Sequence, residues 1–226
     1  MSRSAHQHRK AGFTIVEVIF AMAILLLVVA GVLPMYVQSS RSIMTADSKL
    51  DVNGDVRKVT DQMIENARQA DAFVLYDNYK GAWIDGDFVD FRSSSYAGMG
   101  RLRDGQTGRF LVLLFYDDDP YPNDSNPPPL KQMVGLYLDA DESETTGSIR
   151  TFVKESFDHS KTMEENIPAA ALMGTHEAII PSMTGLMGGD VFYNFGGKSV
   201  MVNGKISHAN GAIKETNTYN FTITPR

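Results

Sequence analysis

The residues best suited to chemistry lie near the N-terminus, where a polar, basic leader meets a long apolar run. Gly12 and Phe13 form the junction, and Glu17 is the single charged residue in 13–37. A carboxylate inside an apolar membrane helix costs on the order of 2.5–3.5 kcal/mol, so it needs a partner. Cleavage between Gly12 and Phe13 would create a cationic α-amine one helical turn before Glu17. If the chain is cut at this junction, the spacing predicts an amine–carboxylate pair, within one chain or between neighbours.

Glu17 and Pro34 each have a second interpretation. Glu17 lies only five residues into the predicted helix, so its side chain could instead extend to the lipid headgroups. Pro34 lacks an amide N–H and is expected to kink or loosen the helix. A loosened helix at Pro34 could help the segment leave the bilayer and bend. Alternatively, Gly31 and Pro34 simply mark the place where the helix exits the membrane.

Other motifs of known chemistry are incomplete. His176 and Glu177 begin like a zinc-protease helix, but Ile180 stands where the second histidine is needed. The sequence has no nucleophile elbow, no P-loop and no dinucleotide-binding glycine pattern after a strand. It therefore predicts no catalytic residue, no cofactor and no metal ion, which is the pattern of a protein that is not an enzyme.

Two acidic clusters leave one alternative open. The aspartates of 117–119 and the acids of 139–144 carry oxygen atoms of the kind that calcium prefers. The second cluster has Glu144 where an EF-hand loop needs its glycine. Solvated acidic turns are the favoured interpretation, and a calcium loop is the alternative.

Charge and cysteine content exclude several classes. The 226-residue chain has a net charge of −6 and no cysteine. Arg3, Arg9 and Lys10 give residues 1–12 a charge of +3, so the remainder carries −6 − 3 = −9. An acidic body lacks the clustered basic face of a nucleic-acid-binding protein. Without cysteine the chain has neither disulfides nor thiolate metal sites.

Composition divides the chain into four segments. Residues 1–12 are a leader, and 13–37 form an apolar helix that would rise about 37 Å, enough to cross the roughly 30 Å hydrocarbon layer of a bilayer. The basic leader places the N-terminus in the cytoplasm and the remainder outside. Residues 38–72 are predicted to continue as an amphipathic helix, and 73–226 to form a β-rich extracytoplasmic domain.

The predicted fold is α+β, a long N-terminal helix packed on a mostly antiparallel sheet. Apolar residues of the amphipathic helix recur at helical spacing and predict a face that packs against the domain: Val52, Val56, Val59, Met63, Ala67 and Ala70. Contact of this face with the helix of a neighbouring subunit is the alternative. Gly54 is a weak point where the helix could bend. Strands are predicted at 87–92, 109–116, 132–138, 148–157, 190–195, 199–202 and 218–224. A short helix is predicted within 164–180, around Pro168.

The N-terminal pattern resembles the class III signal of type IV pilins and pseudopilins. Gly12, Phe13, Thr14, Glu17 and Pro34 stand where that family has its conserved pattern. The resemblance implies cleavage after Gly12 by a prepilin peptidase and N-methylation of Phe13. It also implies a role in assembly for Glu17 and Thr14, with Glu17 pairing with the N-terminus of an adjacent subunit. The sequence-specific likeness covers 9–37, and the remainder shares only the layout of helix first and sheet after.

The resemblance implies a structural subunit, without an active site, in the cytoplasmic membrane or in a filament. Its partners would be the peptidase and methylase and other pilin or pseudopilin subunits, contacted through the N-terminal helix. A minor pilin of a type IV pilus and a pseudopilin of a type II secretion system are both possible; the lack of cysteine departs from many major pilins. The rival interpretation is an uncleaved, signal-anchored binding or sensory domain. An anchored hydrolase has no residue constellation to support it.

Overall fold

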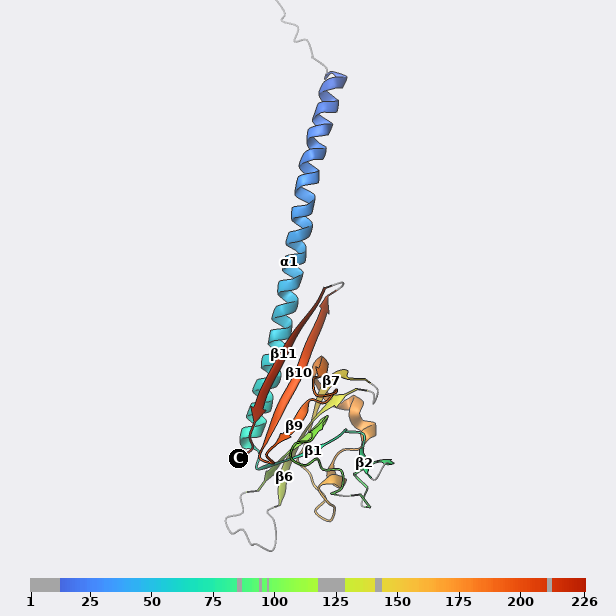
Figure 1. Ribbon diagram of the computed structural model, residues 1–226, viewed down its shortest axis with the longest axis vertical. Helices are drawn as coiled ribbons and strands as arrows, with labels where there is room; N and C mark the ends of the chain where they lie inside the picture. Colours follow the sequence, from blue (N-terminus) through green and yellow to red (C-terminus); the bar gives the residue numbers. More distant parts are fainter. Residues whose placement is uncertain are drawn as a thin grey trace, which may run out of the picture. The chain divides into compact units, whose positions relative to one another are not determined.

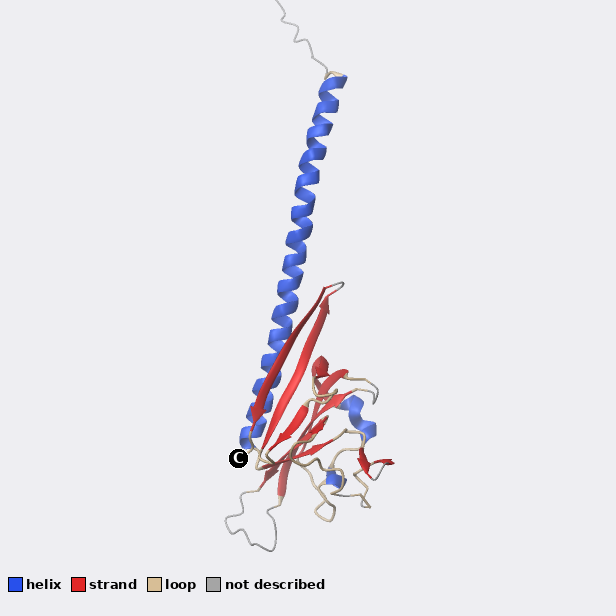
Figure 2. Ribbon diagram, viewed as in Figure 1, coloured by secondary structure: helices blue, strands red, loops and turns tan. Residues whose placement is uncertain are grey.

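A computed structural model describes residues 13–84, 87–93, 95–96, 98–117, 129–140, 144–210 and 213–226. Helix α1 (Ile15–Gln69) opens the described part, and strands follow it to the C-terminus (Figures 1 and 2). The chain divides into two compact units, one ending at Ala46 and the other comprising Asp47–Arg226. The leader, including Gly12, lies outside the described residues. The predicted α+β class is confirmed.

The strands form one large antiparallel sheet and one small one. The large sheet has the order β1-β5-β6-β7-β8-β10-β9-β4, with β11 also paired to β10, and β2 pairs with β3 in the small sheet. The bounds are β1 (Ala72–Tyr76), β2 (Ala82–Ile84), β3 (Asp87–Val89), β4 (Thr107–Gly108), β5 (Phe110–Tyr116), β6 (Leu130–Asp139), β7 (Thr146–Lys154), β8 (Glu177–Gly185), β9 (Phe192–Phe195), β10 (Ser199–Asn210) and β11 (Ile213–Ile223). Every pairing is antiparallel, as predicted.

One face of the C-terminal half of α1 packs against this sheet. Val52, Val59, Met63 and Ala67 are each at most 2% exposed and share one core cluster with residues of the large sheet. Their spacing places them on one side of the helix, and burying a large apolar side chain contributes about 1.5–3 kcal/mol. The predicted core contact is therefore confirmed. The helix is continuous through Pro34 and Gly54, so the bend considered at Gly54 does not interrupt it.

The central strands are buried on both faces. In β5, Leu111 and Leu113 join the cluster beneath α1, whereas Phe110 and Val112 join a second cluster on the opposite face. This explains why 110–116 is a continuous apolar run instead of an alternating one. The second cluster is rich in aromatic rings, among them Tyr76, Tyr79, Phe91, Tyr137 and Phe152.

The predicted strands differ from the observed ones mainly at their ends. Strand β10 continues eight residues beyond the predicted end at Val202, through Gly204 and Lys205. Those residues break the apolar pattern, but pairing with β11 along the whole strand keeps them in the ladder. Strands β1, β2, β4 and β8 were not predicted, and α1 ends at Gln69, three residues before the predicted limit.

The helix predicted within 164–180 is only partly correct. Two short 3-10 helices, η1 (Glu164–Asn166) and η2 (Ala170–Thr175), lie on either side of Pro168. From Glu177 the chain instead forms β8, which pairs with β7. The sheet partner satisfies the backbone groups of this segment, and such tertiary pairing overrides local helix preference.

A buried carboxylate anchors η1 to the sheet. Glu164, 1% exposed, accepts hydrogen bonds at Oε1 from Tyr76 Oη (2.9 Å) and from Arg101 Nε (2.6 Å). Burial raises the pKa of the Tyr76 hydroxyl, so at neutral pH this group is protonated and donates to Glu164. The network joins β1, the segment around Arg101 and η1 in one contact.

Replacing this carboxylate should destabilise the fold. Glu164→Ala leaves the buried Tyr76 hydroxyl without its acceptor and Arg101 without its partner, and we expect a loss of about 2–4 kcal/mol in the free energy of unfolding. Urea denaturation of the full chain in detergent measures it. Glu165→Ala is the matched control, because the neighbouring Glu165 is only half-buried and the described bonds of its carboxylate are to Thr162 alone. Equal effects of the two variants would contradict the anchor.

The second cluster also contains a half-buried histidine, which makes stability depend on pH. His176 Nδ1 lies 2.8 Å from Tyr137 Oη, and its ring contacts those of Tyr79 and Phe152. Burial, and secondarily the charge of Arg150, lower the pKa of His176. The folded state therefore binds fewer protons than the unfolded state, whose histidine has a pKa of about 6.5.

It follows that stability falls as the pH drops below about 6.5 and levels off below the folded pKa of His176. His176→Gln should reduce the loss of unfolding free energy between pH 7.5 and pH 5.5, measured by urea denaturation. His159→Gln, at an exposed position, should retain the loss. An unchanged pH dependence in His176→Gln would show that other groups cause it.

Candidate functional site

The candidate site is the N-terminal end of α1, where Thr14 and Glu17 bond to each other. Glu17 Oε2 accepts hydrogen bonds from the Thr14 backbone N–H (3.0 Å) and from Thr14 Oγ1 (3.0 Å). In return, Thr14 Oγ1 accepts a bond from the Glu17 N–H (3.3 Å). This reciprocal arrangement is a capping box, in which a hydroxyl residue and a glutamate three positions later satisfy free N–H groups of the first turn. A carboxylate in this turn also interacts favourably with the helix dipole.

The cap brings the carboxylate close to the predicted processing site. Phe13 lies directly before Thr14, is 88% exposed and precedes the first helical residue, Ile15. Because Glu17 reaches back to the amide of Thr14, its carboxylate lies within one residue of the Phe13 nitrogen. The described bonds of this carboxylate all involve Oε2. Oε1 can therefore accept a bond from an ammonium group while the cap stays intact.

The surface around this cap is apolar on all sides. Within 13–37 every residue is exposed, including Ile15 (80%), Leu27 (75%) and Met35 (75%). The most apolar window of α1 has a mean hydropathy of 2.9, and by length and composition this helix can span a membrane. A helix that is apolar all round requires a lipid environment or neighbouring apolar helices.

Glu17 belongs to a continuous row on this helix. Phe13 lies four residues before Glu17, Ala21 lies four residues after it, and Leu25 lies four residues further on. Val18 and Met22 lie beside this row. A helix packed along this row would meet one carboxylate within an otherwise apolar contact. Such a group specifies register, because any pairing that leaves the charge without a partner is unfavourable.

Both acidic clusters lie partly outside the described residues, so a metal site at either one is untested. Across the described part of the chain, no group of three His, Cys, Asp or Glu side chains could hold a metal ion. Asp139 is paired with Arg150 at 2.7 Å, and Asp117 lies 3.9 Å from Lys131. Residues 118–119 and 141–143, which complete the two clusters, lie outside the described residues.

A family model described as the prokaryotic N-terminal methylation motif matches residues 7–33. This segment includes Gly12, Phe13, Thr14 and Glu17, so the N-terminal signal predicted from these residues is confirmed. Comparison with curated proteins and with solved structures gives no match. The chain thus carries a type IV pilin-type signal at its N-terminus, followed by a helix able to span a membrane.

The capping box itself was not predicted, although its signature is present in the sequence. Threonine followed three positions later by glutamate, directly before an apolar run, is the pattern of a capped helix start. Glu17 was interpreted through its charge alone. The roles assigned to Gly12, Phe13, Glu17 and Thr14 in processing and assembly, and the kink at Pro34, stay predictions.

Proposed function

We propose that the chain is a structural subunit, either a minor pilin of a type IV pilus or a pseudopilin of a type II secretion-type filament. A prepilin peptidase removes residues 1–12, and the new amine of Phe13 is methylated. The observation that carries the proposal is the methylation motif at 7–33, which overlaps an apolar helical segment, 13–37, whose residues are all exposed. The protein acts through assembly and has no catalytic activity of its own.

The fate of the apolar helix follows from its position after the cleavage site. An ordinary secretory signal loses its apolar segment, because cleavage comes after it. Here the cut precedes Phe13, so the mature protein keeps the whole of α1. Before assembly, 13–37 lies in the cytoplasmic membrane with the C-terminal domain outside, in agreement with the basic residues of the leader. In a filament, apolar helices of neighbouring subunits replace the lipid around the segment.

Glu17 links processing to assembly. The Thr14 cap fixes one carboxylate oxygen and leaves the other available. Cleavage creates an ammonium group at Phe13, which in the precursor is a neutral amide. We propose that Oε1 of Glu17 then binds the Phe13 ammonium of an adjacent subunit, so that only processed chains pair. In an apolar surrounding the paired state is much more favourable than an isolated charge.

The first test is the N-terminus of the mature protein. Mass spectrometry of the full chain recovered from membranes should find N-methylated Phe13 as the first residue. Gly12→Leu should block cleavage, since it places a bulky side chain at the scissile bond, while membrane insertion continues. An intact Met1, or a terminus beyond Pro34, would instead support an uncleaved signal-anchored domain or an ordinary signal.

The second test separates the charge of Glu17 from its capping role. Glu17→Gln retains a side chain that can cap Thr14, but it cannot carry a negative charge. If amine pairing drives assembly, both Glu17→Gln and Glu17→Val should insert into the membrane yet fail to enter sheared filaments, as measured by immunoblot. Thr14→Ser keeps the capping hydroxyl and should assemble normally. Normal incorporation of Glu17→Gln would show that the glutamate serves only as a cap.

A further inference from the structure

Strand β11 is a long sheet edge without a partner on one side. It pairs with β10 at every position from Ile213 to Ile223 (Figure 1). Among the described strands none pairs with its other side, and the backbone hydrogen bonds of turns and loops described for the chain involve none of Thr216–Ile223. Every second residue of this stretch therefore presents its N–H and C=O outward.

The opposite edge of the large sheet, at β1, is partly covered by another segment of the chain, unlike the edge of β11. At β1, Leu75 O accepts a hydrogen bond from Leu102 N–H (2.8 Å), and Tyr76 forms a bridge with Arg101. Directly after β1, the Arg109 N–H donates to Asp77 O (2.8 Å). The chain from Arg101 to Arg109 thus covers that edge from Leu75 to Asp77.

Beyond Lys214 and Glu215 at its start, the edge of β11 lacks the usual protection against added strands. Natural proteins block such edges with lysine, proline, inward charges or bulges. The sequence of 216–223, TNTYNFTI, contains no charge, no proline and no glycine, and its pairing with β10 has no register shift. Threonine, tyrosine, phenylalanine and isoleucine favour strands. The stretch from Thr216 to Ile223 therefore contains none of the residues that usually block an edge.

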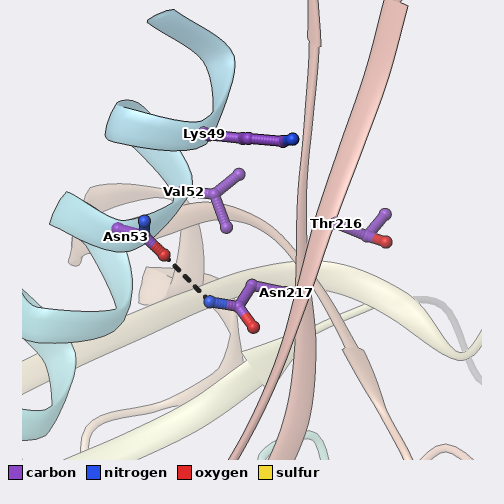
Figure 3. Close-up of a pocket in the computed structure, with 5 residues that line it drawn as sticks. All are labelled: Lys49, Val52, Asn53, Thr216 and Asn217. Atoms are coloured by element: carbon purple, nitrogen blue, oxygen red, sulfur yellow. Dashed lines mark hydrogen bonds between the residues drawn. The ribbon is translucent and has the colours of Figure 1, made fainter. Parts of the chain in front are cut away.

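A small polar cavity lies beside this edge. It has a volume of about 210 Å³ and is lined by Lys49, Val52 and Asn53 of α1 and by Thr216 and Asn217 of β11. Figure 3 shows the Lys49 side chain extended toward the strands, while Asn217 Nδ2 donates to Asn53 Oδ1 at 2.9 Å. Val52 is buried at 2% exposure, and the other four residues are exposed. A side chain entering this cavity meets two amides, a hydroxyl and one positive charge.

A second copy of the chain could join this edge in one two-fold arrangement. The contact of Asn53 with Asn217 and the bond from Arg226 N to Ala70 O show that 53–70 of the chain and β11 run in the same direction. Two β11 edges joined about a two-fold axis run antiparallel, so the helix residues 47–69 of the two copies would also run in opposite directions. The positive charge of Lys49 beside the edge favours instead a partner segment that carries an acidic residue.

We propose that the β11 edge binds an extended segment of a different protein, which adds to the sheet as a further strand. The backbone groups of Thr216–Ile223 supply the hydrogen bonds, and side chains at alternate positions supply specificity, as in other cases of strand addition. The segment carries an aspartate or glutamate that enters the cavity and pairs with Lys49. Its other residues are uncharged and β-branched, matching the threonines of β11.

Photocrosslinking in the membranes of the producing cells tests this proposal. A benzophenone amino acid is placed at Thr216, Thr218 or Asn220 of the full chain, three exposed positions two residues apart. Mass spectrometry of the crosslinked peptides should map these positions to residues two apart in one segment of one partner protein. That regular register is the signature of a strand. Crosslinks to β11 of a second copy, crosslinks without register, or no crosslinks would each overturn the proposal.

Charge reversal tests the acidic side chain. Lys49→Glu should lower the crosslinking yield by roughly two- to fivefold, the range that cross-strand pair energies allow. Lys58→Glu is the control, because position 58 lies nine residues further along α1 and thus on its opposite side. Equal yields from the two variants would exclude the contact with Lys49. The proposal rests on the β11 edge and the cavity beside it and not on the filament role, so its failure leaves the N-terminal processing test unaffected.

Discussion

Burial of one face of α1 against the large sheet is the interaction on which the fold of the C-terminal unit depends. Val52, Val59, Met63 and Ala67 place an apolar stripe on strands that come from distant parts of the sequence. Without this helix the central strands would expose one apolar face to water. The same helix lacks any such burial in 13–37, where every residue is exposed. The C-terminal half of this continuous helix therefore buries its apolar side chains against its own chain. The apolar side chains of its N-terminal half need a membrane or other helices to cover them.

Glu17 has one role in the structure, as a helix cap, and a second, proposed role after cleavage. In the structure it caps the first turn of α1 through Thr14, which satisfies backbone N–H groups that would otherwise lack partners. Only one of its two oxygens is used in this way. The other suits the ammonium group that cleavage before Phe13 would create. The capping box thus holds the carboxylate in place before its proposed partner exists, so that less conformational freedom is lost when the pair forms.

In the C-terminal unit, other parts of the chain cover much of the large sheet, but not the edge of β11. The face of the sheet opposite α1 is covered by an aromatic cluster and anchored by the Glu164 network, and the β1 edge is covered by the chain around Leu102. The edge of β11 is different, since among the described strands it has no second partner, it carries no charge from Thr216 to Ile223, and it lies beside a polar cavity. A stable antiparallel domain and an available strand edge are compatible, because the buried faces carry the stability while the edge costs little when water solvates it.

Local patterns in the sequence determined the helix, the half of it that is able to span a membrane, and the N-terminal methylation motif. Each depends on residues near one another in the chain: a run of apolar residues, helical spacing from Val52 to Ala67, and Gly12, Phe13 and Glu17 at short intervals. The apolar run at 110–116 also predicted a strand, since such a run is buried wherever it lies. Even the capping box was present as Thr14 and Glu17, and it was missed only because the glutamate was considered for its charge.

The tertiary structure alone decided what depends on partners far away in the chain. Strand β8 replaced a predicted helix because β7 offered a ladder, and β10 passed through Gly204 because β11 pairs with it throughout. The burial of Glu164 and the environment of His176 likewise come from residues that are 88 and 39 positions away, Tyr76 and Tyr137. The free edge of β11 is also such a property, since whether a strand has one neighbour or two is set by the order of strands in the sheet. Sequence spacing encodes the faces of an element, whereas its neighbours follow from the packing of the whole chain.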